Sequence, residues 1–246
     1  FGGIGRLYTP DGLARLRKAH ICVIGIGGVG SWVVEALARS GIGELTLIDM
    51  DDICVTNINR QLPAMSGTIG KLKTEVMSER VKLINPECTV NIIDDFISPE
   101  NQSDYLNRGY DYVIDAIDNV KTKASLIAYC KRNKINVITI GGAGGQTDPT
   151  QIQIADLNKT IQDPLLAKVR SVLRKDYNFS QNPKRKFSID AVFSTQPLIF
   201  PQMTEGCAIS ATMNCANGFG AATMITATFG FFAVSRVIDK LLKKKS

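Results

Sequence analysis

The stretch HICVIGIGGVGSWVVEALARSGIGELTLIDMDD, residues 20–52, decides the fold. Residues 21–24 form an apolar run typical of a buried strand, and residues 32–38 then take up helical spacing. Four glycines separate the two segments, namely Gly25, Gly27, Gly28 and Gly30. A second apolar strand over residues 45–48 ends at Asp49. The order of strand, glycine turn, helix and strand predicts a nucleotide-binding βαβ unit.

The residues around this turn suit the parts of a nucleotide. Loop amides and the N-terminus of the following helix attract phosphate, and Ser31, which opens the helix, can face it. Asp49 lies nineteen residues after Gly30, a spacing at which an acidic side chain reaches ribose hydroxyls. No lysine follows Gly30, so this is not a Walker loop. The alternative is that the glycines only allow close packing of strand and helix.

Length and composition bound the class of protein. A chain of 246 residues with 44% hydrophobic residues predicts one globular domain, residues 1–246, with a nucleotide-binding core over 1–145 and a substrate and crossover part over 146–246. None of the six cysteines forms a CxxC pair, so neither a structural zinc site nor a disulfide framework is indicated. Because residue 1 is not followed by a charged and then apolar leader, we expect a cytoplasmic protein.

The basic charge is concentrated in one segment. The formal net charge of the chain is +6, and residues 159–187 hold eight basic and two acidic side chains, which also gives +6. Such a local field suits a polyanionic partner, although a solvated charged helix explains it equally well.

The remaining pattern alternates strands and helices. Apolar runs over residues 89–93, 112–116 and 136–140 read as strands, with helices over 71–85, 99–107 and up to 132 between them. This predicts an α/β fold with a Rossmann-like, mostly parallel sheet and helices on both faces. Residues 152–155 and 189–193 read as later, antiparallel strands enclosing a basic helix over 164–175.

The last part of the chain holds an apolar segment over residues 218–234. It is short for a membrane span, glycine and threonine dilute it, and the following SRVIDKLLKKK continues as an amphipathic helix. A buried or interfacial C-terminal helix is therefore favoured. The alternative is a membrane-associated protein.

Five spaced motifs resemble the ubiquitin-activating-enzyme-like adenylating superfamily. They are GIGGVGS at 25–31, the pair Asp49 and Asp51, NINRQ at 57–61, KLK at 71–73 and DAIDN at 115–119. Three further stretches, at 4–32, 141–152 and 218–231, resemble the branch that dehydrates threonylcarbamoyladenosine in tRNA. The CxxC pairs of sulfur-carrier activators are missing.

The resemblance implies a homodimer that uses ATP and Mg²⁺ to adenylate the carboxylate of threonylcarbamoyladenosine beside the tRNA anticodon. Ring closure then releases AMP. The alternative within the superfamily is an adenylyltransferase that activates the C-terminus of a small sulfur-carrier protein. A nucleotide-binding scaffold or a dinucleotide oxidoreductase is disfavoured, because NINRQ, Lys73 and Asp118 have no task there. A sulfur-relay protein partner is possible in this branch.

The resemblance also implies roles for individual residues. Asp49 accepts from the ribose, Arg60 and Lys73 neutralise the triphosphate and the transition state, and Asp118 holds Mg²⁺. Asn57 or Asn59, with Gln61, holds the segment in place. Arg6 is a candidate to reach the ATP of the other protomer. The implied ATP-site residues are Gly25, Gly27, Gly28, Gly30, Ser31, Asp49, Asp51, Asn59, Arg60, Lys73, Asp118 and Asn119.

Other positions have competing interpretations. Asp49 and Asp118 can instead cap turns, and Arg60 can form a surface ion pair. Cys207 and Cys215 lie in a loop where related enzymes carry a catalytic cysteine, but ring closure by a group of the substrate itself needs none. A monovalent cation near residues 206–217 is a further expectation.

The basic segment gains a role once tRNA is the expected partner. The charged residues proposed to contact it are Lys168, Arg170, Arg174, Lys175, Lys184, Arg185 and Lys186. Tyr177 and Phe179 provide rings that can stack on unpaired bases.

Overall fold

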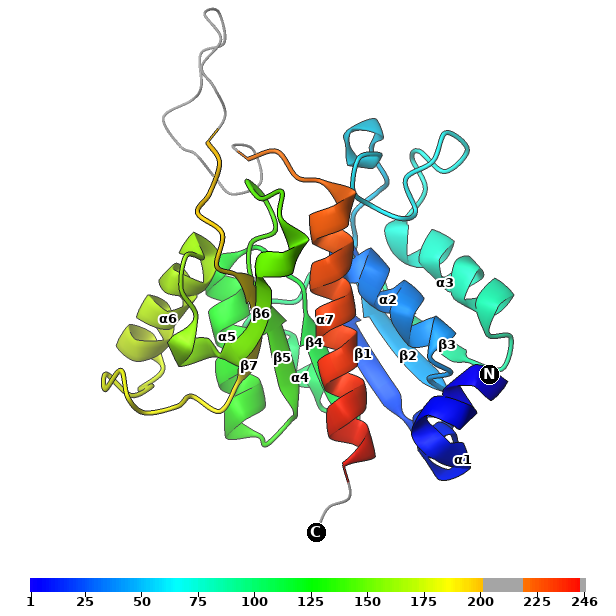
Figure 1. The fold of residues 1–246 in the computed structure, drawn as a ribbon, viewed down its shortest axis with the longest axis horizontal. Coiled ribbons are helices and arrows are strands. Elements are labelled where there is room, and N and C mark those ends of the chain that lie inside the picture. The colour runs from blue at the N-terminus through cyan, green and yellow to red at the C-terminus, as the bar shows by residue number, and fades with distance from the viewer. Residues whose placement is uncertain (201–218, 244–246) are drawn as a thin grey trace, which may run out of the picture.

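The computed structural model describes residues 1–200 and 219–243, and its core is a seven-stranded sheet (Figure 1). The strands are β1 (His20–Ile24), β2 (Glu44–Ile48), β3 (Thr89–Ile93), β4 (Tyr112–Asp115), β5 (Val137–Ile140), β6 (Ile152–Asp156) and β7 (Asp190–Ser194). The α-helices are α1 (Gly2–Lys18), α2 (Gly30–Arg39), α3 (Lys73–Ile84), α4 (Gln102–Leu106), α5 (Val120–Arg132), α6 (Pro164–Asp176) and α7 (Thr223–Leu242). The short 3₁₀ helices are η1 (Val55–Asn57), η2 (Pro149–Gln151) and η3 (Leu157–Lys159).

The order of strands across the sheet is β3-β2-β1-β4-β5-β7-β6. Every neighbouring pair is parallel except β6 and β7. The mostly parallel α/β fold is therefore confirmed. The two later strands, β6 and β7, pair antiparallel with each other as expected, while β7 is in addition parallel to β5. β6 ends beside the start of β7, with Asp156 opposite Asp190, so the connection through α6 leaves and returns at the same edge of the sheet.

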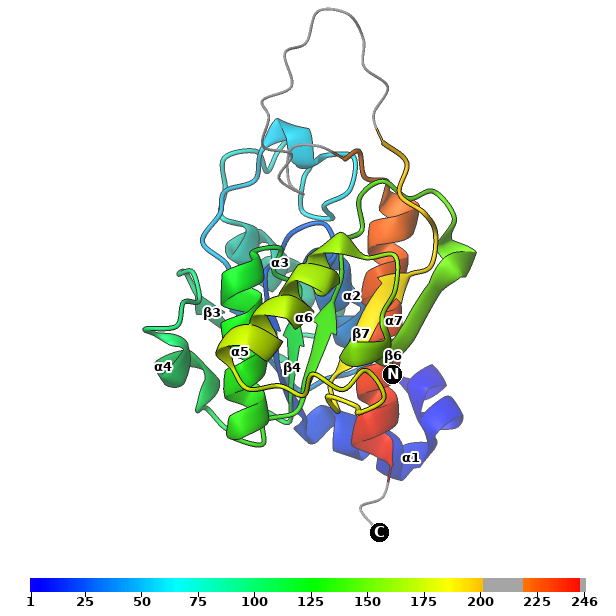
Figure 2. The same cartoon turned by 90° about the vertical axis from the view of Figure 1, so that its left-hand side faces the viewer.

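Helices cover both faces of the sheet. Along β1, Ile21 and Val23 pack into the core shared with α1, α2, α3 and α7, whereas Cys22 and Ile24 pack into the core shared with α5 and α6. Figure 2 shows α5 and α6 on the face opposite α7. Burial on both faces explains why this strand is apolar at every position after His20.

The C-terminal helix α7 lies across the sheet as part of the core. Phe229 and Val237 are 0% exposed, and Gly230 meets α2 so closely that a Cβ there would lie 3.1 Å from the Val29 carbonyl oxygen. The expectation of a buried C-terminal helix is thus confirmed. Among the residues described, no helix has the length and apolarity that crossing a membrane requires.

The N-terminal helix α1 packs where the strands begin. It is interrupted at Thr9, whose φ is 70° and whose hydroxyl accepts a hydrogen bond from the Gly12 N–H at 3.2 Å. Behind it, the Gly43 and Glu44 N–H groups donate to the Leu16 and Ala19 carbonyls. This fixes α1 at the amino edge of the sheet, away from the glycine turn.

Candidate active site

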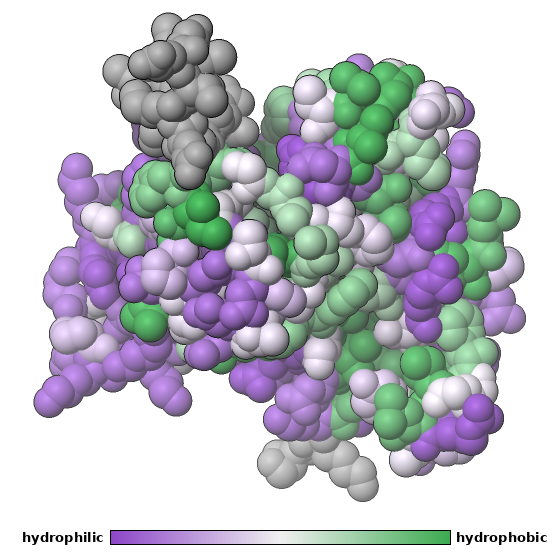
Figure 3. Space-filling model, turned by 45° about the horizontal axis from the view of Figure 1, so that its top comes forward, coloured by the Kyte–Doolittle hydropathy of each residue, from purple (hydrophilic) through white to green (hydrophobic). Residues whose placement is uncertain are grey.

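A cavity of about 1120 Å³ opens at the carboxyl ends of the strands. The glycine turn after β1, the end of β2, the segment at residues 56–61, the start of α3 and the loop after β4 all line it. Figure 3, with this edge of the molecule brought forward, shows polar and apolar side chains mixed across it. The parallel sheet therefore gathers the sequence-predicted motifs at one edge.

The glycine turn combines packing with access to the cavity. Gly25 has φ +85°, and a Cβ on Gly30 would lie 1.8 Å from the Gly25 carbonyl oxygen, so no side chain fits there. Gly27 and Gly28 line the cavity, while Gly30 does not. Packing and ligand access are thus divided among the four glycines.

Asp49 lies in the wall of the cavity at the end of β2. Its Oδ2 accepts a hydrogen bond from the Ile26 N–H at 2.6 Å, and its Oδ1 accepts one from the Asp51 N–H at 2.9 Å. Burial raises the pKa of this carboxyl above its usual value, and the Lys73 ammonium and the two N–H groups act in the opposite direction. The side chain is therefore fixed in orientation beside the turn.

Lys73 projects from the first turn of α3 into the same wall. Its side chain is 6% exposed, and its Nζ lies 2.6 Å from Asp51 Oδ2 and 4.0 Å from Asp49 Oδ1. An ammonium group held in this position beside an open cavity can bind a polyanion such as a triphosphate.

Arg60 lies across the glycine turn. Its side chain backs Gly28, where a Cβ would come within 3.2 Å of Arg60 Cγ, and its Nη1 donates to the Thr56 carbonyl at 3.0 Å and to Asn59 Oδ1 at 3.2 Å. Among the described residues, its guanidinium makes no ion pair with a carboxylate. The positive charge is therefore free to meet a ligand.

The segment that carries Arg60 is anchored at several points. The Asn57 side chain accepts from the Cys54 N–H at 3.0 Å, and the Asn59 side chain donates to the Ala221 carbonyl at 2.7 Å. Gln61 is buried, and its Oε1 has no hydrogen-bond partner among the described atoms. The Arg60 carbonyl accepts from the Trp32 indole at 3.0 Å. Helices α2 and α7 thus hold this segment over the turn.

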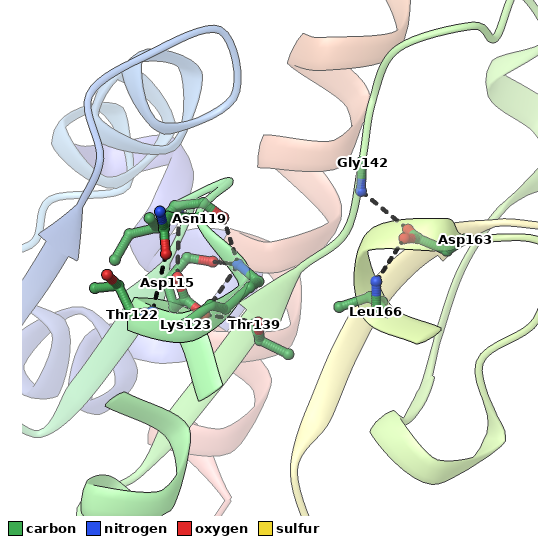
Figure 4. Close-up of polar contacts among 9 residues, drawn as sticks. Asp115, Asn119, Thr122, Lys123, Thr139, Gly142, Asp163 and Leu166 are labelled. Atoms are coloured by element: carbon green, nitrogen blue, oxygen red, sulfur yellow. Dashed lines mark hydrogen bonds and ion pairs between the residues drawn. The ribbon is translucent and has the colours of Figure 1, made fainter. Parts of the chain in front are cut away.

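Asp118 lies in the loop between β4 and α5, exposed at the cavity. Figure 4 shows how the loop is held from below. The Lys123 ammonium is fully buried and lies 3.0 Å from Asp115 Oδ2, and it donates to the Ile117 carbonyl at 2.8 Å. On the other side, the Asn119 side chain caps α5 by accepting from the Thr122 N–H at 3.1 Å. The residues on both sides of Asp118 are therefore fixed.

Two expected residues lie elsewhere. Ser31 is 0% exposed, and its hydroxyl accepts from the Leu62 N–H at 3.2 Å, which turns it away from the cavity toward the segment it supports. Arg6 is exposed on α1 and does not line this chain's own cavity. Cys207, Cys215 and the cation region at 206–217 lie outside the described residues.

Two further walls of the cavity follow strand ends, and of their residues the sequence had placed only Gly141 at this edge of the sheet. Residues 95–98, after β3, line it, and so do residues 141–144, after β5. The buried Asp163 accepts from the Gly142 N–H at 2.9 Å and from the Leu166 N–H at 2.9 Å, which joins the second wall to α6 (Figure 4). Both segments could have been assigned to the site from the sequence, because each comes directly after a predicted parallel strand.

The basic segment is only partly free. Arg170 binds the Thr160 hydroxyl, and Arg174 lies over the Phe187 ring, 5.6 Å from its centre. Tyr177 and Phe179 pack against the core, which leaves these rings engaged and argues against base stacking there. The exposed basic residues of this segment are Lys159, Lys168, Lys175, Lys184, Arg185 and Lys186.

Comparison with known proteins gives concordant results. Residues 4–246 match the model described as "ThiF family". The chain is 98% identical over 246 residues to a tRNA threonylcarbamoyladenosine dehydratase of Haemophilus influenzae, covering 100% of the chain and 94% of that protein. It is 58% identical over 252 residues to the Escherichia coli protein of the same name, covering 99% and 94%. A crystal structure of the E. coli enzyme with ATP is similar with a TM-score of 0.90, 56% identity, and 98% and 93% coverage.

Proposed function

The chain belongs to the ThiF family, and from this premise we propose that it is an ATP-dependent dehydratase acting on threonylcarbamoyladenosine beside the anticodon of tRNA. The observation that carries the proposal is the convergence of the glycine turn, Asp49, Arg60, Lys73 and Asp118 on one cavity. Two relatives, at 98% and 58% identity, are tRNA threonylcarbamoyladenosine dehydratases by name. Crystal structures of the E. coli enzyme contain ATP in one case and AMP in another.

The reaction consists of two displacements. An oxygen of the substrate carboxylate bonds to the α-phosphorus of ATP while the bond to pyrophosphate breaks. A nucleophile within the same modified base then bonds to the acyl carbon, loses its proton, and AMP departs with the former carboxylate oxygen. ATP thus removes the elements of water, and the protein needs to align and neutralise charge without itself becoming acylated.

The cavity residues have distinct tasks in these steps. Asp49 accepts from the ribose hydroxyls, and the amides of Gly27 and Gly28 approach the phosphates. Arg60 and Lys73 stabilise the extra negative charge that develops at the α-phosphate during attack. Residues 95–98, which follow the neighbouring strand, line the same cavity.

Asp118 fits a magnesium ligand. No cluster of three His, Cys, Asp or Glu side chains that could hold a metal ion occurs in the described part of the chain, so phosphate oxygens and water must complete the coordination. Mg²⁺ commonly binds this way, through one or two carboxylates and the phosphates of the nucleotide. When bound, it would neutralise phosphate charge.

Other parts of the proposal concern assembly and location. Three exposed apolar side chains in the segment between β2 and α3, those of Val55, Ile58 and Met65, support association with a second copy. In such a homodimer, Arg6 is the candidate to reach the partner's ATP.

We propose a cytoplasmic location for the enzyme because tRNA is its substrate. A monovalent cation and a sulfur-relay partner stay predictions.

The proposal is tested by measuring AMP release. The protein is incubated with ATP and either tRNA containing threonylcarbamoyladenosine or a small carrier protein ending in Gly-Gly. We expect AMP and pyrophosphate in equal amounts with this tRNA, and none above background with the carrier or with tRNA lacking the modification. AMP release with the carrier alone would replace the proposal by the adenylyltransferase alternative.

A further inference from the structure

A second large cavity lies at the opposite edge of the sheet. It encloses about 1470 Å³ and is lined where β4, β5 and β7 begin and where α1, α5 and α7 end. We call it the amino-edge cavity. It shares no lining residue with the cavity at the carboxyl ends of the strands, which we call the ATP cavity. The two are separated by the length of the strands, which for the four residues of β4 is about 13 Å.

The amino-edge cavity is strongly basic. Nine lysine and arginine side chains line it against three aspartates, a formal excess of six positive charges. Three of the nine have carboxylate partners: Arg236 and Lys240 with Asp190, and Lys243 with Asp239. The cations that make no ion pair with a described carboxylate are Arg15, Lys18, Lys131, Lys134, Lys159 and Lys186.

The fold itself does not balance this charge. Three helices end at the cavity, and each helix C-terminus carries roughly half a negative charge, about 1.5 charges together. This leaves most of the excess uncompensated. Two of the cations are also held in place, because Arg15 donates to the Leu242 carbonyl at 2.8 Å and Lys159 to the Pro183 carbonyl at 2.7 Å. Two of the positive charges are therefore already held in position before a ligand binds.

We infer that the amino-edge cavity binds the phosphodiester backbone of tRNA at a stretch remote from the base being modified. The inference rests on the proposed function and assigns part of its substrate-binding surface. Phosphates are the ligands that a ring of lysines from separate elements fits best. Bases are not stacked here, because the two lining tyrosines, Tyr110 and Tyr112, are 8% and 6% exposed.

The basic segment connects this cavity to the rest of the surface. Lys186, the last cation of the run at residues 184–186, lines the cavity, and Lys184 and Arg185 are exposed directly before it. A polyanion bound to that run therefore meets Lys186 and then Lys131 and Lys134. A ligand that also places a base in the ATP cavity has to run around the outside of the protein from one edge of the sheet to the other, so full-length tRNA is the ligand expected to reach both.

The test compares two matched double variants. Lys18→Gln/Lys131→Gln removes two cavity cations, and Arg17→Gln/Arg132→Gln removes two neighbouring exposed charges on the same helices that do not line the cavity. Binding of full-length tRNA and of an isolated anticodon stem–loop is measured for each over a range of salt concentrations, together with ATP affinity.

We expect the cavity variant to bind full-length tRNA about tenfold more weakly, with the slope of log affinity against log salt shallower by about one to two units. The control variant should change neither, and the stem–loop and ATP affinities should stay the same in both. The inference is overturned if the cavity variant equals the control, or if stem–loop binding falls as much as tRNA binding. Failure of the wild-type protein to bind tRNA at low salt would instead count against the proposed function itself.

Discussion

The Lys73 ammonium lies 2.6 Å from the Asp51 carboxylate in the wall of the ATP cavity. The two partners differ in exposure, since the Lys73 side chain is 6% exposed and that of Asp51 is 52% exposed. Solvent weakens an ion pair on the open side, whereas the buried lysine cannot turn away into water. Phosphate oxygens entering the cavity can therefore compete with Asp51 for a cation that is already in position.

Replacing this cation tests its catalytic role. Lys73→Met should lower the rate of AMP release by a factor of about 10² to 10³, the usual effect of losing one preorganised charge on a transition state. Circular dichroism and tRNA affinity should be unchanged. A rate within tenfold of the wild type would show that Lys73 serves only its pair with Asp51.

The role of Asp118 is tested by ATP binding with and without Mg²⁺. Asp118→Asn should remove most of the gain in ATP affinity that Mg²⁺ provides, and should leave Mg²⁺-free affinity equal or higher because a negative charge beside the phosphates is gone. Asp104→Asn, at an exposed aspartate on α4, is the matched control. A normal Mg²⁺ response in Asp118→Asn would exclude this carboxylate as a metal ligand.

The buried pair below Asp118 predicts a stability effect. Lys123→Met leaves the fully buried Asp115 carboxylate without its cation and should lower the free energy of unfolding by about 3–5 kcal/mol. Lys123→Met/Asp115→Asn should recover at least half of that loss, since the amide oxygen still accepts from the Ile117 N–H and the amide N–H can donate to the Thr139 hydroxyl oxygen. Urea unfolding measures both. Equal losses in the single and double variants would mean that packing, and not charge, sets the effect.

The glycine turn gives a second stability prediction. Gly30→Ala should destabilise the protein by about 3 kcal/mol, because the new methyl group meets the Gly25 carbonyl oxygen at 1.8 Å unless the backbone moves. Gly67→Ala provides the control, since nothing lies within 4 Å of a Cβ there. Thermal unfolding of the two variants should separate them clearly, and similar melting temperatures would contradict the packing argument.

The pattern of the sequence predicted the strands and placed Asp49 and Asp118 at one edge of the sheet, because each follows the end of a buried apolar run, whereas Lys73 was assigned to the site only by the family resemblance. It could not predict which way Ser31 turns. Its hydroxyl accepts a hydrogen bond from the Leu62 N–H, a contact between elements that periodicity does not encode. The same limit applies to the pairing of β7 with β5, to Phe179 packing against Phe187, and to the basic residues that three separate helices bring to one cavity.

The central claim is that the substrate carboxylate captures the α-phosphorus of one ATP bound against the glycine turn. Transfer of ¹⁸O tests it most directly: tRNA whose threonylcarbamoyladenosine carboxylate is labelled with ¹⁸O is converted with unlabelled ATP, and the released AMP is analysed by mass spectrometry. We expect AMP carrying one ¹⁸O atom for each ring formed. Unlabelled AMP, or ADP and phosphate in place of AMP, would contradict it.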